Sequence, residues 1–139
     1  MNTALLYALF DLTRRQLHVA NAGLITPILY HDGAFSYVEC YGLPLGAVPG
    51  EIYEEERIDL YPGDVILLMT DGIVEAMNRA RDLYGFPRLE AVLAECDMSN
   101  AQRVVDTVFD SVFEFMEGVP PHDDMTLVAV RVDDRRMPH

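Results

Sequence analysis

The chain contains no lysine: all ten of its basic residues are arginine, against 23 aspartate and glutamate residues. This absence excludes any mechanism that needs a catalytic lysine. The formal net charge of −13 argues against nucleic acid as a partner, because phosphate backbones are bound by clustered arginine and lysine. Most of the carboxylates are expected to be solvated surface charges, but they also permit a divalent cation site.

Cysteine, long apolar runs and several catalytic motifs are also scarce or missing. Cys40 and Cys96 form no C-x-x-C pair, so neither a zinc knuckle nor a redox motif is available. The apolar runs, such as Val65–Met69, are too short to span a membrane, and no secretion signal opens the chain. We therefore expect a cytoplasmic protein that contacts no membrane. No G-x-S-x-G elbow, P-loop or G-x-G-x-x-G is present, so nothing supports nucleophilic serine catalysis.

The apolar residues that are present predict a chain rich in strands. Half of the 139 residues are apolar, which suits one domain with a core. Residues 3–11 form a long apolar run, predicted to be a strand buried on both faces or nearly so. Further strands are predicted at residues 16–21, 26–30, 35–39, 52–60, 65–70 and 125–132. An Asp-Gly turn at residues 31–34 predicts a hairpin, and the glycine- and proline-rich residues 41–50 predict a structured loop.

Helices are predicted at residues 72–78, 87–95 and 99–117. The last is the strongest, because apolar residues recur at three- and four-residue steps and Gly118 ends it. Ser99 and Gln102 are predicted to form an S-x-x-Q capping box at its start. Hairpin-connected strands followed by helices predict an α+β domain, with antiparallel sheets and helices packed on a face.

Two acidic segments occupy positions where carboxylates can do chemistry. Asp71 directly follows the buried strand at residues 65–70, and Gly72 after it lets a ligand or backbone approach closely. Asp123 and Asp124 lie in the loop before the last strand. Asp71 and Asp123 could converge on one metal ion if their strands are neighbours; the alternatives are an ordinary turn and a solvated acidic pair. His18 and His31 are expected at surface positions, and Glu51 and the glutamates at 54–56 at a solvated edge.

Three segments resemble the SpoIIE/RsbU-like branch of the PPM-type (PP2C-like) serine/threonine phosphatases, in the right order and spacing. They are V-A-N-A-G at residues 19–23, then G-L-P-L-G at 42–46 with L-Y-P-G-D…T-D-G-I-V-E-A at 60–76, and D-D-M-T-L-V at 123–128. The P-G-D…T-D-G-apolar-apolar-E-A string is highly specific, whereas D-D-M-T-L alone would be weak. The resemblance covers essentially the whole chain.

The resemblance implies an antiparallel β-sandwich with flanking helices (α/β/β/α) and a site for two Mg²⁺ or Mn²⁺ ions. A metal-bound water would attack the phosphorus of phosphoserine or phosphothreonine on a protein. Asp71 matches the family's aspartate in T-D-G, Asp123 matches the first aspartate of D-D-x-T, and Asp124 is a weaker ligand that supports the loop. The family's usual partners are phosphorylated anti-sigma-factor antagonists.

Two departures from the family limit what the resemblance implies. The early G-D-apolar-S-G-H-G segment with its metal-bridging aspartate is absent, and Leu24 stands where histidine usually follows N-A-G. We therefore expect residues 1–139 to be a single partial phosphatase domain with an incomplete metal site and little activity alone. The alternative function is a catalytically incomplete module that signals by contact. We also expect a homo-oligomer joined through residues 3–11, because an unpaired apolar edge invites pairing.

Overall fold

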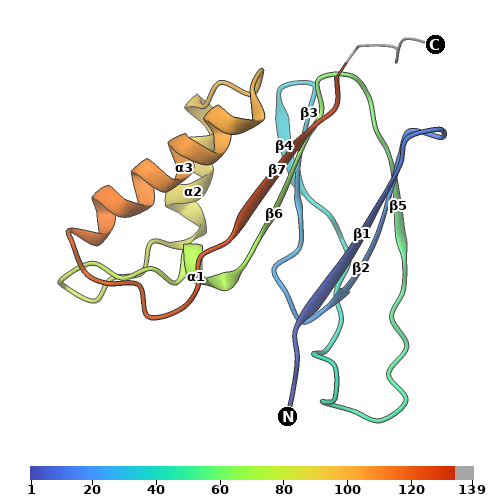
Figure 1. Cartoon of the computed structure of the whole chain (residues 1–139), viewed down its shortest axis with the longest axis horizontal. Helices are drawn as coiled ribbons and strands as arrows, with labels where there is room; N and C mark the ends of the chain where they lie inside the picture. Colours follow the sequence, from blue (N-terminus) through green and yellow to red (C-terminus); the bar gives the residue numbers. More distant parts are fainter. Residues whose placement is uncertain (134–139) are drawn as a thin grey trace. The chain divides into compact units, whose positions relative to one another are not determined.

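A computed structural model of the chain describes residues 1–133 (Figure 1). Within it the chain forms two compact units, one made of residues 1–64 together with the segment from Val132, the other of Val65–Arg131. Each unit contains an antiparallel β-structure, and the helices belong to the second. The predicted α+β fold with antiparallel sheets is confirmed.

The first unit contains a three-stranded antiparallel sheet and a hairpin. The sheet consists of β1 (Leu5–Asp11), β2 (Gln16–Ala22) and β5 (Glu56–Asp59), in the order β1-β2-β5. Strand β2 alternates as the sequence predicts, with Leu17 and Val19 fully buried on one face. The hairpin pairs β3 (Ile28–His31) with β4 (Ala34–Tyr37). Asp32 and Gly33 both have positive φ, as required by a two-residue hairpin turn that matches the right-handed twist of its strands.

Two strand predictions in this unit are wrong in part. Residues 3–11 were expected to be buried on both faces, but Leu5, Tyr7 and Leu9 of β1 leave about half of their side-chain surface exposed. Because β1 lies at the edge of its sheet and nearly every position in it is apolar, the sequence carries no alternation that reveals the open face. The strand predicted at residues 52–60 is limited to β5, since Tyr53 is held by a loop contact instead.

The second unit consists of a strand pair and three helices. Strands β6 (Val65–Met69) and β7 (Leu127–Arg131) are antiparallel, with Met69 opposite Leu127. They are joined through α1 (Asp71–Val74), α2 (Gly85–Glu95) and α3 (Ala101–Met116). Figure 1 shows α3 beside both β7 and α2, and its buried side chains recur at four-residue steps, at Val104, Val108, Val112 and Met116. No helix among residues 1–133 combines the length and the apolarity needed to cross a membrane.

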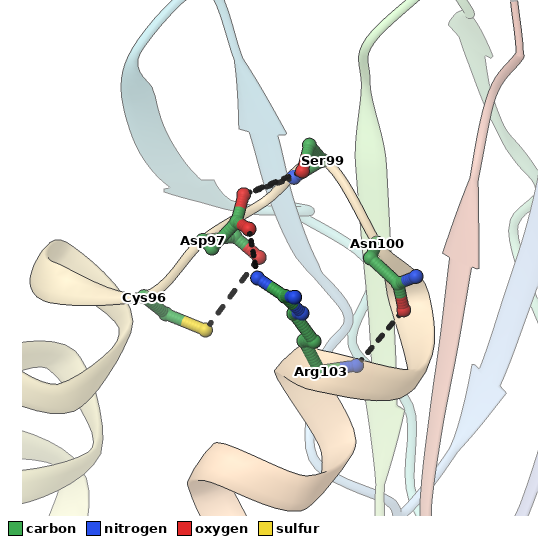
Figure 2. A network of polar contacts seen from close by, with 5 residues as sticks. All are labelled: Cys96, Asp97, Ser99, Asn100 and Arg103. Carbon is green, nitrogen blue, oxygen red and sulfur yellow. Dashed lines mark hydrogen bonds and ion pairs between the residues drawn. The ribbon is translucent and has the colours of Figure 1, made fainter.

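The start of α3 differs from the predicted capping box. The N-cap residue is Asn100, whose side chain accepts a hydrogen bond of 3.1 Å from the Arg103 backbone N–H. Ser99 instead donates from its backbone and its hydroxyl to the Asp97 carboxylate, which also binds the Arg103 guanidinium (Figure 2). Asparagine caps helices at least as well as serine, and Asn100 stands one residue nearer to the helix. The S-x-x-Q interpretation was therefore wrong by one position.

The P-G-D segment closes a turn around a buried carboxylate. Asp64 is 2% exposed, and its Oδ2 accepts the Tyr61 backbone N–H at 2.8 Å. Its Oδ1 lies 2.6 Å from Nδ1 of His31, at the end of β3. Asp64 therefore links the turn to the hairpin, and His31 has a structural partner that the sequence did not predict.

The His31–Asp64 pair makes stability depend on pH. The hydrogen bond to Asp64 raises the pKa of His31 above its ordinary value of 6.5, so protonated His31 is bound more tightly in the folded state. This contribution is fully present below pH 6.5 and is lost as pH rises through the higher folded-state pKa. We expect wild type to exceed His31→Gln in Tm at pH 5.5, and the difference to shrink toward pH 8.5. Thermal melts across this range check it; a constant or growing difference would contradict the assignment.

Candidate functional site

Asp71 stands where β6 passes into α1. Thr70 is the extended N-cap residue of this helix, and Asp71 follows it in the first turn. The Asp71 side chain is half-buried, yet within residues 1–133 its carboxylate makes no hydrogen bond and no ion pair. A carboxylate that has lost part of its water without gaining a protein partner suits a cation ligand.

A clasp of three hydrogen bonds joins this point to the segment before β7. The Thr70 N–H donates to the Thr126 carbonyl at 3.1 Å, and the Thr126 N–H donates to Thr70 Oγ1 at 3.0 Å. The Thr70 hydroxyl in turn donates to the Asp124 carbonyl at 3.2 Å. The two acidic segments therefore lie at the same end of the β6–β7 pair.

Gly72 allows the two segments to approach closely. A Cβ at this position would overlap the Asp124 carbonyl oxygen and would also crowd the Met125 side chain. The backbone after Asp71 therefore lies directly against the loop that carries Asp123 and Asp124. The glycine of T-D-G is required here by contact and not by an unusual φ.

Gly72→Ala is expected to lower the free energy of unfolding by about 2 kcal/mol, because the added methyl group would push the backbone at position 72 away from the Asp124 carbonyl in a packed region. Urea denaturation would measure this change. The control is Gly50→Ala, where a Cβ meets nothing within 4 Å but φ is +75°; its strain should cost about 1 kcal/mol. Equal effects of the two substitutions would contradict a close approach at Gly72.

Asp123 and Asp124 contribute differently to the loop. Both side chains are exposed, and Asp123 Oδ1 accepts the Asp124 N–H at 2.8 Å. Asp124 binds the clasp through its carbonyl. In the described region Asp124 therefore contributes to the structure through its backbone. Asp123, in contrast, keeps a second carboxylate oxygen that has no protein hydrogen bond in this region.

The donor set has the chemistry of a hard-cation site but not a full ligand cluster. Carboxylate oxygens are the ligands that Mg²⁺ and Mn²⁺ prefer, and two acidic segments meet at one strand end. Among residues 1–133, however, no three histidine, cysteine, aspartate or glutamate side chains lie together so that they could hold a metal ion.

The V-A-N-A-G and G-L-P-L-G segments have an architectural role. Asn21 is 3% exposed; its amide donates to the Leu24 and Cys40 carbonyls and accepts the Leu24 N–H. Gly23 packs against Pro44, and a Cβ at Gly42 would overlap the Asn21 carbonyl. The hydrogen bonds that Asn21, Asp64 and His31 make with other segments were not predicted from the sequence. For Asn21 the sequence did offer a sign, because the alternation along β2 places this polar residue on the buried face of the strand.

Comparison with known proteins places these motifs in a family. The sequence profile of Stage II sporulation protein E (SpoIIE) matches residues 1–133. The chain is 31% identical over 136 residues to the phosphoserine phosphatase RsbU of Bacillus subtilis (strain 168), covering 94% of this chain and 39% of RsbU. It therefore spans about two fifths of that relative.

Solved structures show the same fold. The SiaA-PP2C domain of Pseudomonas aeruginosa matches with a TM-score of 0.81 at 21% identity, over 94% of this chain and 52% of that domain. The manganese-presoaked phosphatase domain of the cell fate determinant SpoIIE from Bacillus subtilis matches with a TM-score of 0.75 at 18% identity, over 98% of this chain and 59% of that one. The predicted PP2C-like architecture is confirmed by these matches.

Proposed function

Because the chain belongs to the SpoIIE family, we propose that it forms part of a metal-dependent protein serine/threonine phosphatase. Residues 1–139 would be a partial domain of this enzyme. The observation that carries the proposal is the half-buried Asp71 carboxylate, which has no protein partner in the described residues and lies beside the Asp123–Asp124 loop. The family match supports it, as does the manganese-presoaked state of one structural relative.

In this proposal Asp71 and Asp123 hold Mn²⁺ or Mg²⁺, and Asp124 is the weaker third ligand. The metal ions would supply charge that makes a water nucleophilic at neutral pH and that offsets negative charge on the phosphoryl group. The protein's own contribution is positional. The Thr70–Thr126 clasp fixes the strand end, and the contact at Gly72 keeps the two acidic segments together before any cation binds.

The proposal is tested by phosphate release from a phosphoserine peptide, using the full-length protein that carries this chain. We expect turnover with Mn²⁺ or Mg²⁺, loss of turnover in EDTA, and recovery when metal is restored. Turnover that persists without a divalent cation would contradict the metal-dependent mechanism.

The second candidate function is a catalytically incomplete module that regulates by binding. It is favoured by one observation, the lack of a three-ligand cluster within residues 1–133. Such a module would bind a phosphorylated protein without releasing phosphate at any metal concentration. Phosphate release by the full-length protein, measured beside binding, separates the two functions.

The substrate that we propose is a phosphorylated regulatory protein of the anti-sigma-factor-antagonist type, acted on in the cytoplasm. The support is similarity to RsbU, which is a phosphoserine phosphatase. Incubating the full-length protein with such an antagonist, phosphorylated on serine, and measuring loss of the phosphate by mass spectrometry tests this step. If the protein dephosphorylates peptides but not the antagonist, the proposed substrate is wrong and the proposed phosphatase activity stands.

We also propose that the chain self-associates through β1. Leu5, Tyr7 and Leu9 form an exposed apolar row on an edge strand, and edge strands with such rows pair readily. Light scattering at micromolar concentration should give at least twice the 15.7 kDa chain mass. Tyr7→Lys should restore the monomer, whereas Val128→Lys, on an exposed residue of β7, should not. A monomeric wild type would overturn the proposal.

A further inference from the structure

The loop between β4 and β5 exposes large apolar side chains. Tyr41 is 74% exposed, Ile52 is 84% exposed and Leu43 is about half exposed. These three residues, called here the apolar patch, lie on two arms of the loop that meet at Tyr53. Tyr41 and Leu43 flank Gly42, whose α-carbon faces the Tyr53 ring, and Ile52 precedes Tyr53 in the chain. Exposed apolar side chains on adjoining segments are typical of interaction sites.

Hydrogen bonds within the chain hold the loop that carries the patch. The Tyr53 hydroxyl donates to the Leu43 carbonyl at 2.8 Å, which ties the two arms of the loop together. Thr3 and Leu45 exchange two backbone hydrogen bonds, of 3.0 and 2.8 Å, which anchor the loop to the start of the chain. A partner would therefore not need to order the loop, and this removes one of the main costs of binding.

The charged residues of the segment that carries the patch have one sign. No arginine, lysine or histidine occurs from Asp32 to Glu56, a stretch that contains six carboxylates. Exposed Glu51 and Glu54 flank Ile52 and Tyr53, and exposed Glu39 lies two residues before Tyr41. This rim repels nucleic acid, anionic lipid and a second copy of this acidic chain, and it attracts a basic surface.

From these observations we propose that the apolar patch and its acidic rim are a docking site for a protein partner that presents a basic segment with an apolar side chain. The apolar side chain would pack between Tyr41, Leu43 and Ile52, and the basic residues would face Glu51 and Glu54. The proposal goes beyond the phosphatase function and does not require the metal site, because every residue it uses lies in the first unit.

The test uses the 139-residue chain and a 12-residue peptide of alternating arginine and leucine as the probe. We expect binding by calorimetry at low salt that weakens as salt is raised. Chemical-shift changes in the isotope-labelled chain should centre on Tyr41, Leu43 and Ile52. A peptide with glutamate in place of arginine, and one with serine in place of leucine, should each bind at least tenfold more weakly.

Matched variants separate the patch from general acidity. Ile52→Ser should weaken peptide binding about tenfold, and the double variant Glu51→Gln, Glu54→Gln about fivefold. Leu12→Ser removes a similarly exposed apolar residue elsewhere in the unit, and Asp110→Asn removes a carboxylate on α3 of the second unit; both should leave the affinity unchanged.

Four results would overturn the proposal. The first is absence of peptide binding, and the second is an equal loss of affinity in the patch and control variants. The third is conversion of an oligomeric chain to a monomer by Ile52→Ser in light scattering, which would assign the patch to a second copy. Binding of the chain to phosphatidylglycerol vesicles, abolished by Ile52→Ser, would likewise assign it to a membrane surface.

Discussion

Asp71→Asn is expected to lower manganese-dependent phosphate release by the full-length protein about a hundredfold. The substitution keeps the shape of the side chain and removes the negative charge that a hard cation requires. A metal ligand contributes on the order of 3 kcal/mol to stabilisation of the charged transition state, and each 1.36 kcal/mol corresponds to a factor of ten in rate. Because the Asp71 carboxylate makes no protein hydrogen bond in the described residues, the fold itself should be little affected.

Two readouts distinguish a ligand from a residue that acts through the fold. Mn²⁺ affinity, measured by calorimetry or electron paramagnetic resonance, should fall for Asp71→Asn and Asp123→Asn, and less for Asp124→Asn. The melting temperature should stay within about 2 °C of wild type, as expected for a substitution that breaks no packing. Asp110→Asn on α3 is the matched control and should change neither readout. Unchanged Mn²⁺ affinity in Asp71→Asn would remove this residue from the metal site.

Asn21→Ala is expected to cost about 4 kcal/mol of the free energy of unfolding. The substitution leaves the Leu24 and Cys40 carbonyls and the Leu24 N–H without their partner, in a region where Asn21 itself is 3% exposed. Each buried polar group left unsatisfied costs about 1–3 kcal/mol. For a chain of this length the melting temperature should fall by about 12 °C.

Asn78→Ala is the matched control for this effect. Asn78 also exchanges hydrogen bonds with a neighbouring segment, through Asp82, but these bonds are exposed to solvent. Its substitution should cost about 1 kcal/mol, because water replaces the lost partners. Chemical denaturation with urea gives both values on one scale. If Asn21→Ala costs no more than Asn78→Ala, the N-A-G segment does not have the architectural role described above.

The elements that could be predicted from the sequence are those with a strong local signal. Strand β6 is a continuous apolar run bounded by a Pro-Gly turn and an Asp-Gly pair, and α3 carries a long apolar face that ends at Gly118. The cap of α3 was misplaced, because Ser99 and Asn100 both suit an N-cap and only the backbone geometry decides between them. The open face of β1 was missed because its apolar residues do not alternate with polar ones.

The candidate site could be located from its motifs, but its supporting contacts could not. The T-D-G and D-D-M-T segments pointed to Asp71 and Asp123 as candidate ligands. The Thr70–Thr126 clasp shows why the backbones of these two segments meet. The pairing of His31 with Asp64 joins residues 33 positions apart through side chains. A contact of that kind depends on the fold of the unit and leaves no local pattern in either segment.

The Thr70–Thr126 clasp also sets when the site can form during synthesis. Its two partners are separated by 56 residues, so closing this loop costs chain entropy that the β6–β7 pairing and the packing of α2 and α3 must offset. At about 10 residues per second, the ribosome needs about 6 s to make the second partner after the first. A nascent chain that ends within α3 has Asp71 but not Asp123. If both carboxylates hold the cation, as proposed above, cation affinity should appear only once this unit has folded completely.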